Sequence, residues 1–300
     1  MDLVTKISPK TVLHAHHPES SFSKTNPNDL ALSLLLNNIV LASLSDFNCS
    51  PTHNNFIDIM EKSKRFTTTN LGEYGRIFQL NGYKQFVVTE QEVSGDQHKI
   101  DVYSLGCRRE IPCDKHWDVH EIIDSVKQYG GIAILNMPFA RDFKPATDDD
   151  RKYLEQLCFE KKWPDSVPDA IDKDALDIWL VRLARSMLSG FKFGNANDLA
   201  EKLALKSGIP LVAVPDTSLR NSDQYSKIVS SFIYFESNPF LESSGEKIVE
   251  KLRGVIQVGE NIGYKNYFEY VSTLNFLTIK LSGRIARQIR MKSYYAKKQK

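Results

Sequence analysis

Histidine and carboxylate residues stand at the ends of several apolar, strand-like runs of this sequence. His14 and His16 end one run, Asp46 ends a second, and Glu92 and Asp216 end two later ones. In parallel β/α folds, active sites are built from residues at the carboxyl ends of the strands. Imidazole and carboxylate groups bind metal ions and transfer protons. The pattern therefore points to a site of this chemistry where the strand ends meet.

Side chains on a strand alternate between two faces, so residues two apart share a face. We expect three sets of residues to share a face in this way: Val12 with His14 and His16, Val88 with Glu90 and Glu92, and Val212 with Val214 and Asp216. Two imidazoles at this spacing stand about 7 Å apart at the backbone and could converge on one ion. A lone His-x-His pair is equally typical of two buried histidines bonded to backbone.

Short apolar runs alternate with amphipathic stretches along most of the chain, as expected of βα units. Two helix starts are well marked, by Asn26 to Asp29 and by the capping box of Asp118 and Glu121. The expected strands are Thr11–His16, Ile39–Ser45, Arg76–Leu80, Phe86–Val93, Lys99–Leu105, Ile132–Leu135, Leu211–Val214 and Ser231–Phe235. This α/β pattern suits either a closed barrel or an open doubly wound sheet.

Two segments depart from the alternation. Residues 139–175 are polar and too long for a βα loop, so we expect an insertion there. Residues 241–300 are expected to form a helical C-terminal extension, following a first domain of residues 1–240.

The stretch 280–300 carries eight Lys or Arg and no acid, whereas the whole chain has 39 basic and 37 acidic residues. This basic helix could dock on the body of the protein or contact nucleic acid.

Five segments, in order, resemble those of the PHP (polymerase and histidinol phosphatase) family. They are Thr11–His16 for its D-L-H-x-H strand, Ala42–Asn48 for I-T-D-H-N, Val88–Ser94 for P-G-I-E-I-S, Gly130–Pro138 for G-G-x-x-x-x-A-H-P, and Val214–Ser218 for G-S-D-A-H. The resemblance covers residues 12–236. It implies a distorted (β/α)7, TIM-like barrel and a metal-dependent phosphoesterase activity.

The resemblance also implies a reduced metal site. His14, His16, Glu92 and Asp216 match positions that hold one metal in the family, and they suit one divalent Zn²⁺, Mn²⁺ or Fe²⁺. Three family histidines are replaced, by Phe47, Met137 and Ser218, and Lys24 stands near a family acid. A mononuclear site, or no metal at all, follows.

Four further residues could act at such a site. Asp46 could orient a ligand histidine or accept a proton, or it could cap its own loop. Arg141 and Arg220 could bind a phosphate in bidentate fashion, and Lys24 could supply a lost positive charge. Solvent exposure is the alternative for all three cations.

Composition excludes other classes of protein. No apolar run reaches the roughly 18 residues of a membrane helix, and no secretory signal is evident. Four cysteines without CxxC spacing favour free thiols and a cytoplasmic location. Two functions remain: a hydrolase of a phosphorylated small molecule or nucleotide, or an inactive PHP-fold scaffold that binds partners such as nucleic acid through its tail.

Overall fold

The computed structural model of the chain describes the strands and helices that surround the predicted site. The described residues are 9–16, 27–47, 61–62, 65–96, 98, 100–112, 117–136, 138–141, 144–174, 196–214, 217–218, 231–241, 244–258 and 264–268. All of the basic tail at 280–300 lies outside these residues.

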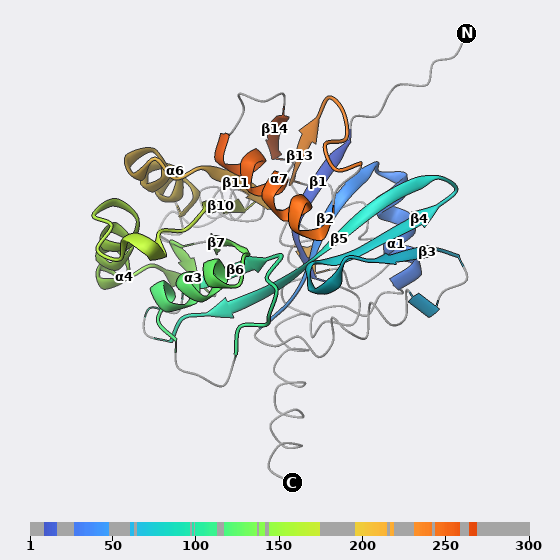
Figure 1. Cartoon of the computed structure of the whole chain (residues 1–300). Coiled ribbons are helices and arrows are strands. Elements are labelled where there is room, and N and C mark those ends of the chain that lie inside the picture. The colour runs from blue at the N-terminus through green and yellow to red at the C-terminus, as the bar shows by residue number, and fades with distance from the viewer. Residues whose placement is uncertain are drawn as a thin grey trace.

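Eight strands form a nearly closed, barrel-shaped sheet, which is the main feature of Figure 1. In spatial order they are β11 (Leu211–Val214), β10 (Ala170–Asp174), β7 (Ile132–Asn136), β6 (Asp101–Leu105), β5 (Tyr83–Ser94), β2 (Ile39–Phe47), β1 (Lys10–His16) and β13 (Ser231–Phe235). The two ends of this series, β11 and β13, lie close together. The short β12 (Thr217–Ser218) adds a parallel pairing to β1. The structure thus favours the closed alternative over the open sheet.

The strands do not all run parallel, contrary to the simple βα alternation. The pairs β1–β2, β2–β5, β7–β10 and β10–β11 are parallel, but β6 is antiparallel to both β5 and β7. β4 (Gly75–Leu80) forms a hairpin with β5, and β3 (Thr67–Asn70) pairs with β4 beyond the 3₁₀ turn η1 (Gly72–Tyr74). The hairpin turns at Asn81 and Gly82, which both have positive φ, as a two-residue type I′ turn requires.

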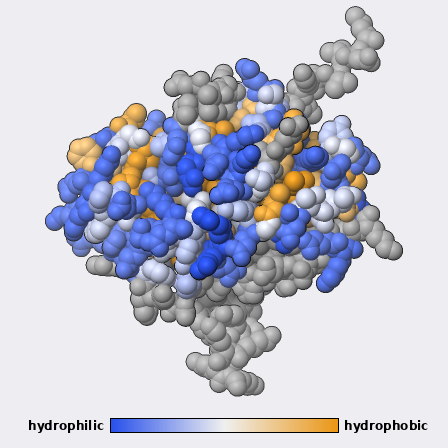
Figure 2. Space-filling view, in the orientation of Figure 1, coloured by the Kyte–Doolittle hydropathy of each residue, from blue (hydrophilic) through white to orange (hydrophobic). Residues whose placement is uncertain are grey.

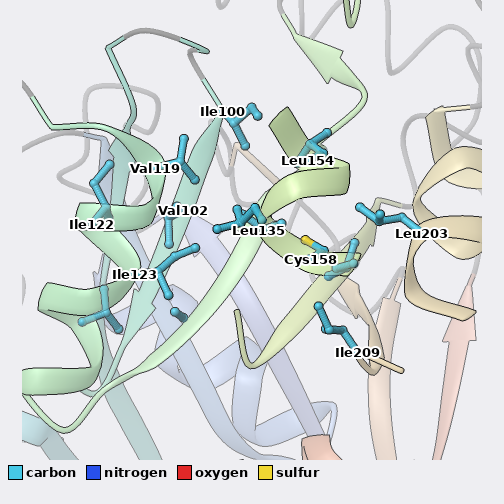
Figure 3. Packing of buried hydrophobic residues seen from close by; sticks show 14 of the residues in the cluster. Ile100, Val102, Val119, Ile122, Ile123, Leu135, Leu154, Cys158, Leu203 and Ile209 are labelled. Carbon is cyan, nitrogen blue, oxygen red and sulfur yellow. The ribbon is translucent and has the colours of Figure 1, made fainter. Parts of the chain in front are cut away.

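Two apolar clusters cover the outside of the sheet. Helix α1 (Pro27–Leu36) packs its Leu30 and Leu34 on β2 and β5. On the other side lie α3 (Val119–Gln128), α4 (Asp148–Leu154) with the π-helical turn η2 (Glu155–Phe159), and α6 (Ala196–Ser207). Figure 3 shows this second cluster; its labelled residues are Ile100, Val102, Val119, Ile122, Ile123, Leu135, Leu154, Cys158, Leu203 and Ile209. The predicted capping box of Asp118 and Glu121 is present at the start of α3.

The inside of the barrel is filled at one end by its own apolar side chains and by α7 (Gly245–Val258). Leu252 of α7 is fully buried in the same cluster as Leu41, Val88 and Ile134. The C-terminal segment also contains β14 (Tyr264–Phe268), which pairs with β13. The described part of residues 241–300 therefore differs from the predicted helical extension, because it contains a strand as well as a helix. It packs in the core of the barrel and joins its sheet.

The segment expected to be an insertion holds one strand of the barrel. Residues 139–175 include the small hairpin of β8 (Ala140–Arg141) and β9 (Lys144–Pro145), α4, η2, the 3₁₀ turn η3 (Pro164–Ser166) and finally β10. β10 lies between β7 and β11. The strand was not predicted from its sequence, AIDKD, because three of its five residues are charged.

The surface of the described residues is mainly hydrophilic on the face in Figure 2, with smaller apolar areas between. None of the helices in the described part of the chain is long and apolar enough to cross a membrane. Cys107 and Cys158 are free thiols, as predicted, and burial raises the pKa of each to about 12.

Candidate active site at the polar end of the barrel

The inward face of the sheet changes from apolar to polar toward the carboxyl ends of its parallel strands. On β5, for example, Val88 belongs to the inner apolar cluster, while Glu90 and Glu92 follow on the same face. We call the buried residues that line this region the polar end: His14, Ser43, Ser45, Glu90, Glu92, Tyr103, Asn136 and Asp172. Such a gathering of polar groups inside a barrel must be held by hydrogen bonds or by a ligand.

His14 enters the barrel through an irregularity in β1. The pairing of β1 with β2 shifts between Val12 and Ala15, and His14 adopts a left-handed conformation with φ of 56°. Val12 packs in the outer cluster with α1, and Leu13 packs inside. The prediction that Val12 and His14 share a face is therefore wrong, because a bulge breaks the alternation at this point.

Three contacts fix the position of His14. Its backbone N–H donates to Ser43 Oγ at 2.7 Å, and its ring stacks on Tyr103 with centroids 3.8 Å apart and planes at 16°. Its Nδ1 donates to Oε1 of Glu90 at 2.5 Å. The Nδ1 atom must carry the proton, since an ionised carboxylate can only accept. The tautomer of His14 is thereby set with Nε2 as the basic nitrogen of the neutral ring.

Glu90 was not among the site residues predicted from the sequence. Its side chain has no exposed surface, and its Oε2 has no hydrogen-bond partner among the residues that the structure describes. Buried carboxylates are normally paired or bound to cations, so this second oxygen marks a place for a positively charged or donating group. Strand alternation predicted that Glu90 and Glu92 share a face, but the family resemblance implied a ligand role for Glu92 alone.

Glu92 also lies at the polar end, but it makes a contact separate from that of His14 and Glu90. Its Oε1 accepts a 2.8 Å hydrogen bond from Nδ2 of Asn136 on β7. Asp172 on β10 is also buried, at 1% exposure. Asn136 ends β7, a strand that the sequence predicted, and Asp172 lies in β10, which the sequence did not predict as a strand. Recognition of both strands would have indicated these two residues.

The structure describes the side chains of only two of the four predicted metal ligands, His14 and Glu92. His14 and Glu92 are both at the polar end, but each bonds to another partner. For His16 and Asp46 the backbone alone is described, with His16 opposite Ser45 on β2. Asp216 lies outside the described residues and directly precedes Thr217 in the sequence. Among the described residues, no group of three His, Cys, Asp or Glu side chains could hold a metal.

The structure does not test the predicted phosphate-binding residues. The backbone of Arg141 belongs to the β8–β9 hairpin, and nothing is described of its side chain. Lys24 and Arg220 lie outside the described residues. Their roles stay predictions.

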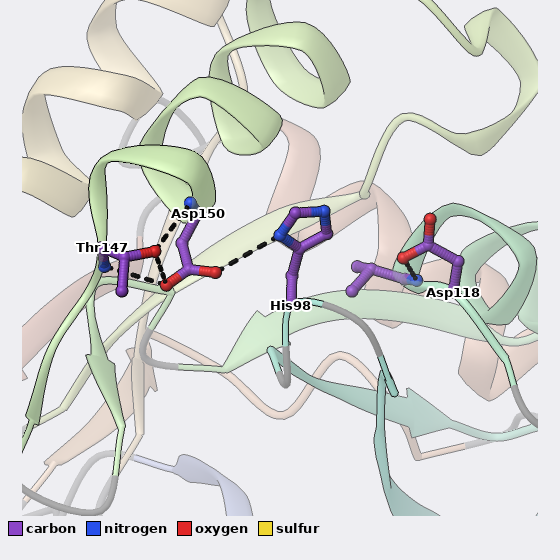
Figure 4. Close-up of polar contacts among 5 residues, drawn as sticks. His98, Asp118, Thr147 and Asp150 are labelled. Carbon is purple, nitrogen blue, oxygen red and sulfur yellow. Dashed lines mark hydrogen bonds and ion pairs between the residues drawn. The ribbon is translucent and has the colours of Figure 1, made fainter.

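A second set of titratable residues lies on the outside, between the end of β5 and α4. Nδ1 of His98 is 3.3 Å from Oδ1 of Asp150, and the other carboxylate oxygen, Oδ2, accepts hydrogen bonds from the backbone N–H and the hydroxyl of Thr147 (Figure 4). His98 also stacks on Tyr153, whose pKa is raised above its usual range by burial. Burial raises the pKa of Asp150, but the hydrogen bonds from Thr147 and the charge of His98 outweigh it, so the pKa lies below its ordinary value. These contacts attach α4 to the barrel.

Comparison with known proteins shows a shared fold and no family. No protein-family description and no curated protein matches the sequence. The crystal structure of PsfC from Pseudomonas syringae PB-5123 superposes with a TM-score of 0.55 at 10% identity, over 93% of this chain and 98% of that one. The two chains share a fold.

Two further structures are less similar. One is a provisionally assigned metal-dependent phosphoesterase from Bifidobacterium adolescentis, with a TM-score of 0.40 and 9% identity over 73% of this chain and 95% of that one. The other is an amidohydrolase from Chromobacterium violaceum with bound sulfate, at 0.41 and 11% over 70% and 87%. These TM-scores are too low to indicate a common fold or activity.

Proposed function

We propose that this chain is a PHP-type, metal-dependent hydrolase of a phosphorylated small molecule or nucleotide, with its active site at the polar end of the barrel. The observation that carries the proposal is the buried pair of His14 and Glu90. A histidine that binds a metal through one ring nitrogen almost always donates the other N–H to a carboxylate or carbonyl. His14 has this arrangement, on the face that a barrel enzyme uses for catalysis.

The residues of the polar end fit a divalent metal. His14 offers a basic nitrogen, and Glu90 Oε2 is a buried oxygen to which no residue in the described part of the chain donates a hydrogen bond. His16, Glu92 and Asp216 complete the proposed donor set, a mixture of nitrogen and oxygen suited to Zn²⁺, Mn²⁺ or Fe²⁺. A bound metal would lower the pKa of a water molecule and polarise a phosphoryl oxygen.

The protein side chains would perform the remaining tasks. Glu90 fixes the tautomer of His14 and raises its basicity, while Tyr103 and Ser43 prevent the ring from turning. Asp46, at the end of β2, would accept a proton from the attacking water. Charge on the substrate phosphate would be met by Arg141, Arg220 and Lys24.

The test is metal analysis of the purified protein together with hydrolysis assays. Phosphomonoesters, phosphodiesters and short oligonucleotides would be screened with Mn²⁺ or Zn²⁺. We expect one bound transition metal and metal-dependent turnover in the wild type, both lost in His14→Asn and Asp216→Ala and kept in the control Glu73→Gln, which alters an exposed carboxylate.

Absence of transition metal and turnover in the wild type would overturn the proposal in favour of the scaffold function. In that case we expect salt-dependent binding of polyanions that disappears when residues 292–300 are removed. Binding that is unaffected by this truncation would exclude the scaffold function as well.

A further inference from the structure

The carboxamide of Asn136 is oriented by its contact with Glu92. A carboxylate cannot donate, so the group 2.8 Å from Oε1 of Glu92 must be the NH₂ of Asn136. The amide oxygen, Oδ1, is therefore left to accept from another group. Asn136 is only 5% exposed, and no residue in the described part of the chain donates to this oxygen. A buried acceptor without a donor is costly, so Oδ1 marks a place where a ligand supplies the donor.

Asn136 stands in a row with two residues of the neighbouring strands. In the antiparallel ladders, Asn136 on β7 is opposite Asp101 on β6, and Asp101 is opposite Ser94 on β5. Residues opposite each other in a ladder lie on the same face of the sheet. That face is the inner one, because Ile134, two residues before Asn136, packs in the inner cluster. We call Ser94, Asp101 and Asn136 the rim row.

Two residues of the rim row are partly open to solvent. Ser94 and Asp101 are half-buried, whereas Glu92 and Tyr103, the next inward-facing pair of the same ladder, are buried. The hydroxyl of Ser94 donates to Oδ1 of Asp101. A carboxylate has several lone-pair sites, so Asp101 can accept from a ligand as well as from Ser94. The rim row therefore offers hydrogen-bond acceptors to a molecule that enters the barrel from this end.

These acceptors select the part of a substrate that carries donor groups. A phosphoryl oxygen is itself an acceptor, so it cannot satisfy Oδ1 of Asn136. The phosphate of the proposed substrate must bind elsewhere at the polar end, and the rim row then faces the alcohol part. A hydroxyl group is the neutral donor that matches a neutral amide oxygen, because burial of an ammonium group costs more desolvation energy.

We propose that the rim row binds hydroxyl groups of the substrate, which is then a phosphorylated polyol such as a sugar phosphate. Side chains opposite each other in a ladder start about 5 Å apart, so Asn136 and Asp101 can each accept from one of two neighbouring hydroxyl groups. A few polar groups of this kind fix the orientation of a bound ligand. The phosphate part of this assignment rests on the proposed function, whereas the preference for hydroxyl groups follows from the rim row alone.

A pair of phosphonates tests this preference without any turnover. One is the dihydroxybutyl phosphonate analogue of glycerol phosphate, and the other is butylphosphonate, which has the same carbon chain without hydroxyl groups. Neither can be hydrolysed, because a carbon–phosphorus bond replaces the ester. Each would be titrated calorimetrically into the full-length protein as purified. We expect the wild type to bind the dihydroxy compound at least about 10-fold more tightly than butylphosphonate.

Asn136→Leu removes the acceptor and should reduce this preference to about 3-fold or less. A purely structural role of Asn136 would instead weaken the binding of both compounds equally. Glu92→Gln still accepts from the NH₂ of Asn136, so it should keep the preference although it removes a charge from the proposed metal site. Asp101→Ala reports if Asn136→Leu does not fold, and it should also lower the preference. Circular dichroism would report the fold of each variant, and Glu73→Gln is the matched control.

Three outcomes would overturn the proposal. The first is a wild type that binds the two phosphonates equally or binds neither. The second is tighter binding of aminobutylphosphonate than of the dihydroxy compound, which would show that the rim row selects an ammonium group. The third is a full preference for hydroxyl groups in both Asn136→Leu and Asp101→Ala. None of these results involves transition-metal content or turnover, so failure of the rim row is distinguishable from failure of the proposed function.

Discussion

His14 on β1 and Glu90 on β5 meet over β2, the strand that separates them in the sheet, with 2.5 Å between Nδ1 and Oε1. Backbones two strands apart are about 10 Å from each other, so only long side chains can bridge the distance. The residues of β2 beneath them are Ser43 and Ser45. Their small side chains leave room for the imidazole and the carboxylate, which a larger residue on β2 would fill.

Glu90→Gln should weaken transition-metal binding without unfolding the barrel. Glutamine keeps the volume and an acceptor oxygen for Nδ1 of His14, but it removes the charge that makes the ring basic. Loss of such a partner typically lowers metal affinity by about 10- to 100-fold. Competition titration of Zn²⁺ against a chelator measures the change, with Glu73→Gln as the matched control. Equal affinities in the two variants would show that Glu90 does not support a metal ligand.

Substitutions of His14 should differ in stability according to their backbone preference. The residue has φ of 56°, a conformation that asparagine tolerates well and β-branched residues tolerate poorly. We expect His14→Val to be less stable than His14→Asn by about 1–2 kcal/mol, although both lack the ring. Urea unfolding measures the difference, and a valine variant as stable as the asparagine variant would argue against the bulge.

Asp150 should stabilise the protein in a pH-dependent manner. Its pKa in the folded state lies below the ordinary value, because Thr147 and His98 outweigh the effect of burial. The stabilisation is therefore fully present above the pKa of the unfolded chain and is lost as the pH falls through the folded value. Asp150→Asn should cost about 1 kcal/mol at neutral pH, and the difference from wild type should shrink below about pH 4.

Urea unfolding at a series of pH values measures this dependence. Asp149→Asn, an exposed neighbour in the same helical turn, is the control and should change little. A destabilisation by Asp150→Asn that stays constant down to acidic pH would assign the effect to packing and not to charge.

Leu252→Ala should show that α7 belongs to the barrel core. The side chain of Leu252 is fully buried against the inner cluster, so its truncation should cost about 2–5 kcal/mol. Glu250→Ala, on the exposed side of the same helix, should stay within about 0.5 kcal/mol of wild type. Thermal unfolding compares the two. If Leu252→Ala were as mild as the control, α7 would be an accessory helix.

Local signals in the sequence predicted most strands and helix starts. The apolar run of β7 and the capping box of α3 are present where they were expected, because burial and capping depend on a few neighbouring residues. β10 was not predicted, because three of its five residues are charged and interrupt the apolar pattern expected of a central strand. The family resemblance selected Glu92, which proved to contact Asn136.

The sequence by itself determined that polar, metal-competent side chains follow apolar strands, because residue type and order are local properties. Only the tertiary structure decided which of them meet. A one-residue bulge in β1 moved His14 out of the expected alternation and toward Glu90. Which side chains come into contact depends on strand order, on register and on the small size of the residues between them. Strand order and register are set by packing between segments that are distant in the chain.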